Sequence, residues 1–140
     1  MSQATESASG VSSRATLRVL VYSDDARTRA QVIGALGTSL HPDLPDLDYV
    51  EVATEPMIYA QLDAHAIDVA ILDGEATPAG GMGVAKQIRD EYDPCPPLVV
   101  LIARTADRWL ADWSRADASA SLPVDPIALS KTIVELLRKK

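Results

Sequence analysis

The stretch Ile67-Asp68-Val69-Ala70-Ile71-Leu72-Asp73-Gly74 decides the fold of this chain. Its apolar positions are almost continuous, which is typical of a strand covered on both faces in the middle of a parallel sheet. The run ends in a carboxylate, Asp73, that is followed by a glycine. Because open α/β sheets place their ligand sites at the carboxyl ends of the strands, we expect Asp73 to lie at the floor of a cleft.

Outward from this stretch, apolar strand patterns alternate with amphipathic helix patterns along the chain. The expected strands cover residues 17–22, 47–53, 67–73, 98–103 and 118–122, and the expected helices cover about 25–36, 54–66, 84–92, 105–115 and 126–138. Strands and helices in strict alternation specify a parallel sheet with right-handed crossovers. The predicted fold class is therefore α/β, a three-layer, doubly wound domain.

Capping residues and apolar stripes support the expected helices. Asp24 or Asp25 can cap the first helix, Gly37 can end it, and Asp125 can cap the last helix. The second helix is expected to bury Met57, Ile58, Leu62 and Ala66. The last helix is expected to bury a longer stripe, made of Ile127, Leu129, Ile133, Val134, Leu136 and Leu137.

Composition and charge exclude several classes of function. The chain has 140 residues, of which 47% are hydrophobic, and a formal net charge of -7. Acidic chains lack the cationic face that binding to nucleic acid phosphates requires. No stretch approaches the roughly 18 apolar residues of a membrane helix, and the N-terminus lacks the apolar core of a signal peptide. We therefore expect a cytoplasmic protein that neither binds nucleic acid nor inserts into a membrane.

We expect a short N-terminal tail followed by one domain. Residues 1–15 are small and polar without periodicity, so we expect a disordered tail. Residues 16–140 then form one domain, and its last helix leaves no room for an output domain. Cys95 has neither a disulfide partner nor metal-ligand companions, so we read it as an inert thiol. His41 and His65 stand alone and are assigned no role.

Four features of the chain carry a resemblance to a known family. They are the acids Asp24 and Asp25 after the first strand, Asp73 at the end of the third, the Pro/Gly-rich loop that follows, and Pro123 after the fifth. Arg29 fits as well. Over nearly its whole length the chain resembles the receiver domain of two-component response regulators, and most of all a stand-alone actinobacterial type with a Leu-Asp-Gly-Glu-Ala pattern.

The resemblance implies a fold, a modification and a metal. It implies the flavodoxin-like strand order 2-1-3-4-5 and phosphorylation of Asp73. It also implies Mg²⁺ held by Asp73, by Asp24, by the backbone carbonyl of Glu75, and through water by Asp25. A cis peptide bond is implied before Pro123. We expect no other cofactor.

Several positions depart from the family pattern, and each departure removes a charged, hydroxyl or aromatic group that the family has there. Ser23 stands where the family has its first acid, Ile102 where it has Ser or Thr, Leu122 where it has Lys, and Ser119 where it has a switch aromatic. Neither Ile102 nor Leu122 can donate a hydrogen bond to a phosphoryl group. The loop after Asp73 is also two residues longer than usual. We therefore expect weak Mg²⁺ binding and weak or absent phosphorylation of Asp73.

The leading hypothesis is an atypical stand-alone receiver that signals by protein contact, with a histidine kinase or a downstream effector as partner. Two variants stay open. In one a kinase phosphorylates Asp73, and in the other the surface binds its partner without phosphate. Trp109 and Trp113, one turn apart, are either packing residues or part of a partner or homodimer face formed by the fourth helix, fifth strand and fifth helix.

Other readings of the same residues remain. Asp73 can be a strand-ending acid, and Asp24 and Asp25 can be helix caps only. A flavodoxin-like cofactor module would need a phosphate cradle after the first strand, where residues 23–27 are acidic. A small phosphohydrolase would need a catalytic lysine late in the chain, and the late lysines lie on or beyond the last helix. We therefore do not expect an enzyme.

Overall fold

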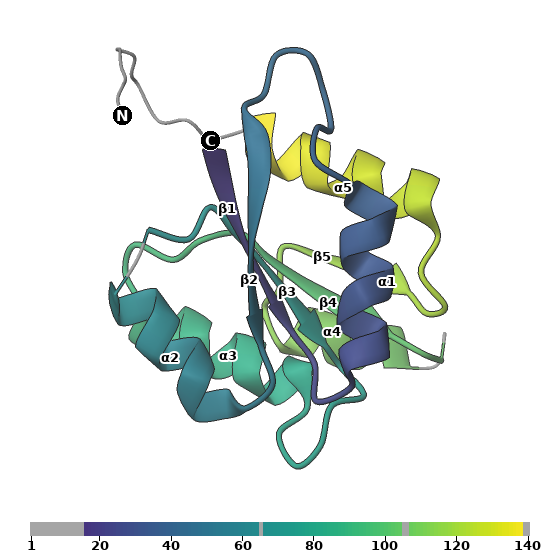
Figure 1. The fold of residues 1–140 in the computed structure, drawn as a ribbon. Coiled ribbons are helices and arrows are strands. Elements are labelled where there is room, and N and C mark those ends of the chain that lie inside the picture. Colours follow the sequence, from purple (N-terminus) through teal and green to yellow (C-terminus); the bar gives the residue numbers. More distant parts are fainter. Residues whose placement is uncertain (1–15, 65, 105–106, 139–140) are drawn as a thin grey trace.

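The computed structural model describes residues 16–64, 66–104 and 107–138. In these ranges five parallel strands form one sheet in the order β2-β1-β3-β4-β5 (Figure 1). The strands are β1 (Thr16–Tyr22), β2 (Asp46–Val52), β3 (Val69–Asp73), β4 (Leu98–Ile102) and β5 (Ala118–Ser121). The predicted α/β class and strand order are confirmed. The predicted disordered tail, residues 1–15, lies outside the described residues, as does His65.

Helices cover both faces of the sheet. They are α1 (Ala26–Leu36), α2 (Glu55–Ala64), α3 (Gly81–Glu91), α4 (Arg108–Trp113) and α5 (Pro126–Arg138). Helices α1 and α5 lie together on one face, and α2 and α3 lie on the other (Figure 1). Successive strand residues point to opposite faces. Leu20 therefore packs in the cluster under α2 and α3, whereas Val19 packs in the cluster under α1 and α5.

Local sequence signals explain the helix ends. The Asp25 carboxylate accepts a hydrogen bond from the Arg27 amide, 2.8 Å away, and so caps α1. Gly37 ends that helix with a left-handed φ of 68°, and its N–H donates to the Ile33 carbonyl. The Asp125 carboxylate likewise accepts from the amide of Ile127 at 3.0 Å. Of the two cap candidates for α1, Asp25 is therefore the cap.

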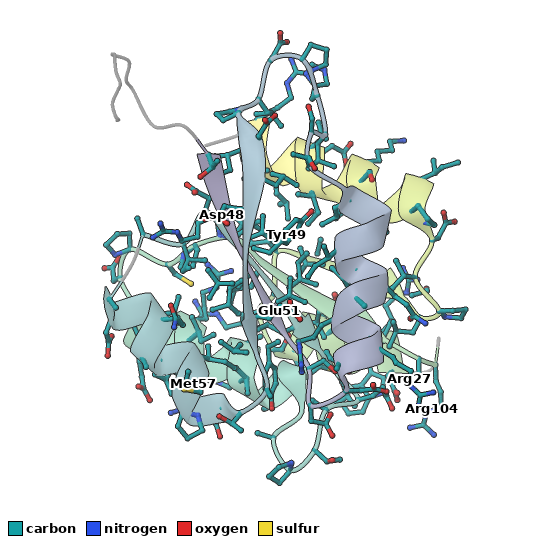
Figure 2. All side chains as sticks on the ribbon, in the orientation of Figure 1. Arg27, Asp48, Tyr49, Glu51, Met57 and Arg104 are labelled. Carbon is teal, nitrogen blue, oxygen red and sulfur yellow. The ribbon has the colours of Figure 1, made fainter. Side chains whose placement is uncertain are left out.

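Three residues expected in the core are exposed. Ala66, expected on the buried side of the second helix, is exposed and lies beyond the end of α2. Met57 on α2 is 47% exposed (Figure 2), and Ile127 in the first turn of α5 is 84% exposed. The buried stripe of α5 consists of Leu129, Ile133 and Leu137. Ile127 lies in the turn that Asp125 caps, before the helix comes to rest on the sheet. The apolar spacing therefore predicted a buried face of α5 that begins one turn too early.

Three helices differ in their bounds from the expectation. Helix α2 ends at Ala64, two residues before the expected end at 66. Helix α3 begins at Gly81, three residues before the expected start at Val84. A Cβ on Gly81 would lie 2.7 Å from the Asp73 carbonyl oxygen, so glycine lets the helix start directly against β3. Helix α4 ends at Trp113 because Arg115 adopts a left-handed φ of 64°. Residues 105–106 of the expected helix lie outside the described residues.

Candidate functional site

Asp73 ends β3 at the carboxyl edge of the sheet and is only 4% exposed. Both of its carboxylate oxygens accept hydrogen bonds. The Ser23 hydroxyl donates to Oδ2 at 2.8 Å, and the Glu75 amide donates to Oδ1 at 2.8 Å. Each donor is neutral. The carboxylate is therefore held by a hydroxyl from the end of β1 and by its own loop.

Ser23 is fully buried and links the β1–α1 turn to Asp73. Its Oγ accepts a hydrogen bond from the Asp25 amide at 3.0 Å while the hydroxyl donates to Asp73. The guanidinium of Arg29 on α1 donates to the Ser23 carbonyl and, at 3.0 Å, to Glu51 on β2. Arg29 therefore fixes the turn from which Ser23 reaches the carboxylate.

The side chain of Asp24 is directed to the loop after β3. Its carboxylate accepts from the Thr77 amide at 3.3 Å and from the Thr77 hydroxyl at 3.1 Å. Next to it, the hydroxyl of Tyr22 donates to the Ala79 carbonyl of the same loop. Burial, with a smaller contribution from neighbouring carboxylates, raises the pKa of Tyr22, so its phenol keeps the proton that it donates.

Glycines fix both ends of that loop. A Cβ on Gly74 would lie 2.5 Å from the Leu101 carbonyl oxygen, and one on Gly81 would lie 2.7 Å from that of Asp73. Close approach is thus needed at both positions, and the groups approached are backbone atoms of β4 and β3 rather than a ligand. The loop leaves the sheet and returns to it at points where no side chain fits.

The two departures at the ends of β4 and β5 pack into different layers. Ile102 is 1% exposed and belongs to the cluster under α2 and α3. Leu122 packs against the cluster under α1 and α5, and the Leu122–Pro123 peptide bond is cis. Ser119 lies within β5, opposite Val100 of β4. The side chains of Ile102 and Leu122 therefore do not share one hollow around Asp73.

The carboxylates expected to hold Mg²⁺ all accept hydrogen bonds from the chain in this arrangement. Magnesium requires several oxygen ligands in an octahedral shell. In the described ranges, no three His, Cys, Asp or Glu side chains gather in a way that could hold a metal. The Asp24 carboxylate is taken by Thr77 and the Asp25 carboxylate caps α1. The site brings Asp24, Asp73 and the Glu75 backbone to one edge, but as a hydrogen-bonded network.

Sequence reasoning missed Thr77 and Tyr22. Tyr22 reads as one more apolar strand residue, and Thr77 as an ordinary loop residue. The one available signal was the extra length of the loop after Asp73, because a longer loop can fold back to the end of a neighbouring strand. The structure shows that it does so.

The outer face of α4 carries two exposed aromatic rings. Trp109 is 65% exposed and Trp113 is 52% exposed. The Lys86 ammonium of α3 lies 5.7 Å from the centroid of the Trp113 ring. A cation over an indole at this distance is a favourable contact. Both rings therefore lie on the surface rather than in the core, and the Lys86 contact orients that of Trp113.

Within the described ranges, none of the helices combines the length and apolar character needed to cross a bilayer.

Comparison with known proteins places this geometry among characterised folds. No family model matches the chain. Two uncharacterized response regulatory proteins, from two strains of Mycobacterium tuberculosis, are each 61% identical to it over 126 residues, which is 90% of this chain and 95% of each relative.

Solved structures show the same fold at low identity. The receiver domain of the Francisella response regulator 1452 superposes with a TM-score of 0.74 at 17% identity, covering 88% of this chain and 98% of that one. The Thermotoga maritima response regulator TrrA, solved with Mg²⁺ and BeF, gives 0.71 at 22% identity over 86% of this chain and 99% of that one. The chemotaxis protein CheY4 of Vibrio cholerae gives 0.69 at 20%, over 88% and 100%.

Proposed function

The chain belongs to the response regulator family, and we propose that it is an atypical receiver domain that signals through protein contacts with weak or absent phosphorylation of Asp73. Receiver domains of two-component systems are signalling modules, and the chain has their fold. The observation that carries the proposal is the pair of neutral donors on the Asp73 carboxylate, Ser23 and the Glu75 amide.

The chemistry of phosphoryl transfer supports this proposal. Transfer to a carboxylate brings negative oxygens against a negative nucleophile, so catalysis depends on cations and hydrogen-bond donors that neutralise the developing charge. The family's Lys position holds Leu122, and its Ser or Thr position holds the buried Ile102. One missing charge-assisted hydrogen bond costs about 1.5–3 kcal/mol, which corresponds to roughly a tenfold to hundredfold loss of occupancy.

The test is phosphorylation by a small phosphodonor with Mg²⁺, read by intact mass. We expect little added phosphoryl mass on the natural chain and roughly tenfold to hundredfold more on Leu122→Lys. Leu122→Met, which keeps the volume without a charge, is the matched control and should behave as the natural chain. Asp73→Asn in the Lys background should abolish the gain. Rapid, complete phosphorylation of the natural chain at Asp73 would refute the proposal.

We further propose the face formed by α4, β5 and α5, with Trp109 and Trp113 on α4, as the contact surface, and a second copy of this chain as the occupant. Arg108 and Asp112 flank Trp109 on the exposed side of the helix. Arg108 and Asp112 carry opposite charges, so this face is complementary in charge to a second copy related by a twofold axis. A kinase or downstream effector is the other kind of partner that the proposed function requires.

A further inference from the structure

We infer that Asp24 is the anchor of a loop latch rather than a metal ligand: Thr77 occupies its carboxylate and holds residues 74–80 closed over Asp73. The name β1 latch is used here for the Asp24–Thr77 and Tyr22–Ala79 contacts together. The latch exists whether or not Asp73 accepts a phosphoryl group, so it stands apart from the proposed function.

Three consecutive residues at the end of β1 contact the segment that starts at Asp73. Tyr22 donates to the Ala79 carbonyl, Ser23 donates to Asp73, and Asp24 accepts from Thr77. Contacts to two points of the loop, Thr77 and Ala79, and to the Asp73 side chain that precedes it restrain the path of the loop. A single hydrogen bond of an exposed residue would not do so.

The ends of the loop cannot move independently of the sheet. Gly74 and Gly81 sit so close to the backbones of β4 and β3 that a Cβ would lie 2.5 and 2.7 Å from carbonyl oxygens. Any opening is therefore confined to residues 75–80, where Thr77 is exposed. The Asp24–Thr77 pair is the part of the β1 latch that solvent and ions can reach.

Thr77 and a divalent cation compete for the same carboxylate. Asp24 accepts the Thr77 amide on Oδ1 and the Thr77 hydroxyl on Oδ2, so both oxygens are engaged. A cation that coordinates Asp24 and the Thr77 hydroxyl compete for the lone pairs of the same carboxylate, so each weakens the binding of the other. Loss of one solvent-exposed hydrogen bond changes such an equilibrium by about threefold to tenfold.

The test compares Thr77→Val, which keeps the shape without the hydroxyl, with Thr77→Ser, which keeps the hydroxyl. Hydrogen exchange of the amides in residues 75–80 should be about threefold to tenfold faster in Thr77→Val. Thr77→Ser should exchange within about twofold of the natural chain. Equal exchange in Thr77→Val and the natural chain would overturn the β1 latch.

A Mg²⁺ titration followed by calorimetry tests the competition. Thr77→Val should bind Mg²⁺ about threefold to tenfold more tightly than the natural chain, and Asp24→Asn should remove that gain. Equal or weaker binding by Thr77→Val, or no measurable binding by either protein, would overturn the competition for Asp24. The phosphodonor experiment on Leu122→Lys measures phosphorylation of Asp73, whereas this titration measures Mg²⁺ binding at Asp24. The proposed function and the competition for Asp24 can therefore fail independently.

Discussion

Ser23 places a neutral hydroxyl beside Asp73, at the position where the family pattern has an acid. A carboxylate at position 23 would place two like charges side by side at the sheet edge, where one of them must be neutralised by a proton or a cation. A hydroxyl removes one charge and supplies a donor, which lies 2.8 Å from Asp73. The buried carboxylate is thereby satisfied by the chain itself.

Gly81 and Gly83 allow a matched test of the close approach under the site. Gly81→Ala should lower the free energy of unfolding by about 1–3 kcal/mol, because the new Cβ would lie 2.7 Å from the Asp73 carbonyl oxygen. Gly83→Ala, in the same turn of α3 with nothing within 4 Å of its Cβ, should raise it by about 0.5–1 kcal/mol. Urea unfolding measures both, and equal effects would contradict the close approach.

For single residues, the sequence predicted where the site residues lie better than it predicted which groups they contact. Asp73 and Asp24 were placed at one sheet edge because the carboxyl ends of parallel strands meet there. The partners of Asp24 could not be predicted, because Thr77 reaches it through a loop whose path depends on Gly74 and Gly81 lying against neighbouring strands. Weak or absent phosphorylation of Asp73 stays a prediction.

Helix α4 is an element whose exposed face has a testable consequence. The double variant Trp109→Ala/Trp113→Ala should abolish self-association of the chain, because buried aromatic anchors dominate interfaces. It should lower the free energy of unfolding by about 1–2 kcal/mol, since Trp113 loses its contact with Lys86 and the buried half of its ring. Sedimentation velocity over a range of protein concentrations measures the first effect and urea unfolding the second.

The matched control for α4 is Ile127→Ala, which removes an exposed apolar side chain from a different element. Ile127 is 84% exposed on α5, so its loss tests whether any exposed apolar group suffices. Self-association should persist in that variant. A natural chain that stays monomeric at all concentrations would reject the homodimer, and an unaffected double Trp variant would place the interface elsewhere.

Helix ends follow local chemistry where a cap decides them and tertiary contacts elsewhere. Asp25, Gly37 and Asp125 ended or began helices as their side chains or backbone freedom predict. The start of α3 and the exposure of Ile127 and Met57 depended on how closely each helix approaches the sheet. Apolar periodicity alone carries no information on that distance.

On the scale of the molecule, the sheet divides the core into two layers that share no helix. The cluster under α2, α3 and α4 includes Ile58 and Ala111, and the cluster under α1 and α5 includes Val32 and Leu129. This division was predictable because β3 and β4 are apolar at every position except the terminal Asp73. Edge strand β2, which carries Asp48, Tyr49 and Glu51 (Figure 2), is only half buried.

The tyrosines of the whole chain predict its response to alkaline pH. All 4 are shifted in one direction: the pKa values of Tyr22, Tyr49, Tyr59 and Tyr92 are raised, with burial as the largest cause in each. For Tyr49, whose hydroxyl donates to the Gly37 carbonyl at the end of α1, the pKa rises from 10.0 to about 12. Between these values the unfolded chain releases protons that the folded chain keeps.

The contribution of the tyrosines to the free energy of unfolding should therefore be constant up to about pH 9 and fall steadily from about pH 10 to about pH 12. The sign follows from proton binding, since the folded state holds more protons over this interval and rising pH favours the state that has lost them. Tyr49→Phe should lower stability by about 0.5–1.5 kcal/mol at neutral pH, through its lost hydrogen bond, but should flatten the alkaline decline. Urea unfolding across the pH series measures both, and a decline equally steep in Tyr49→Phe would show that Tyr49 does not contribute to it.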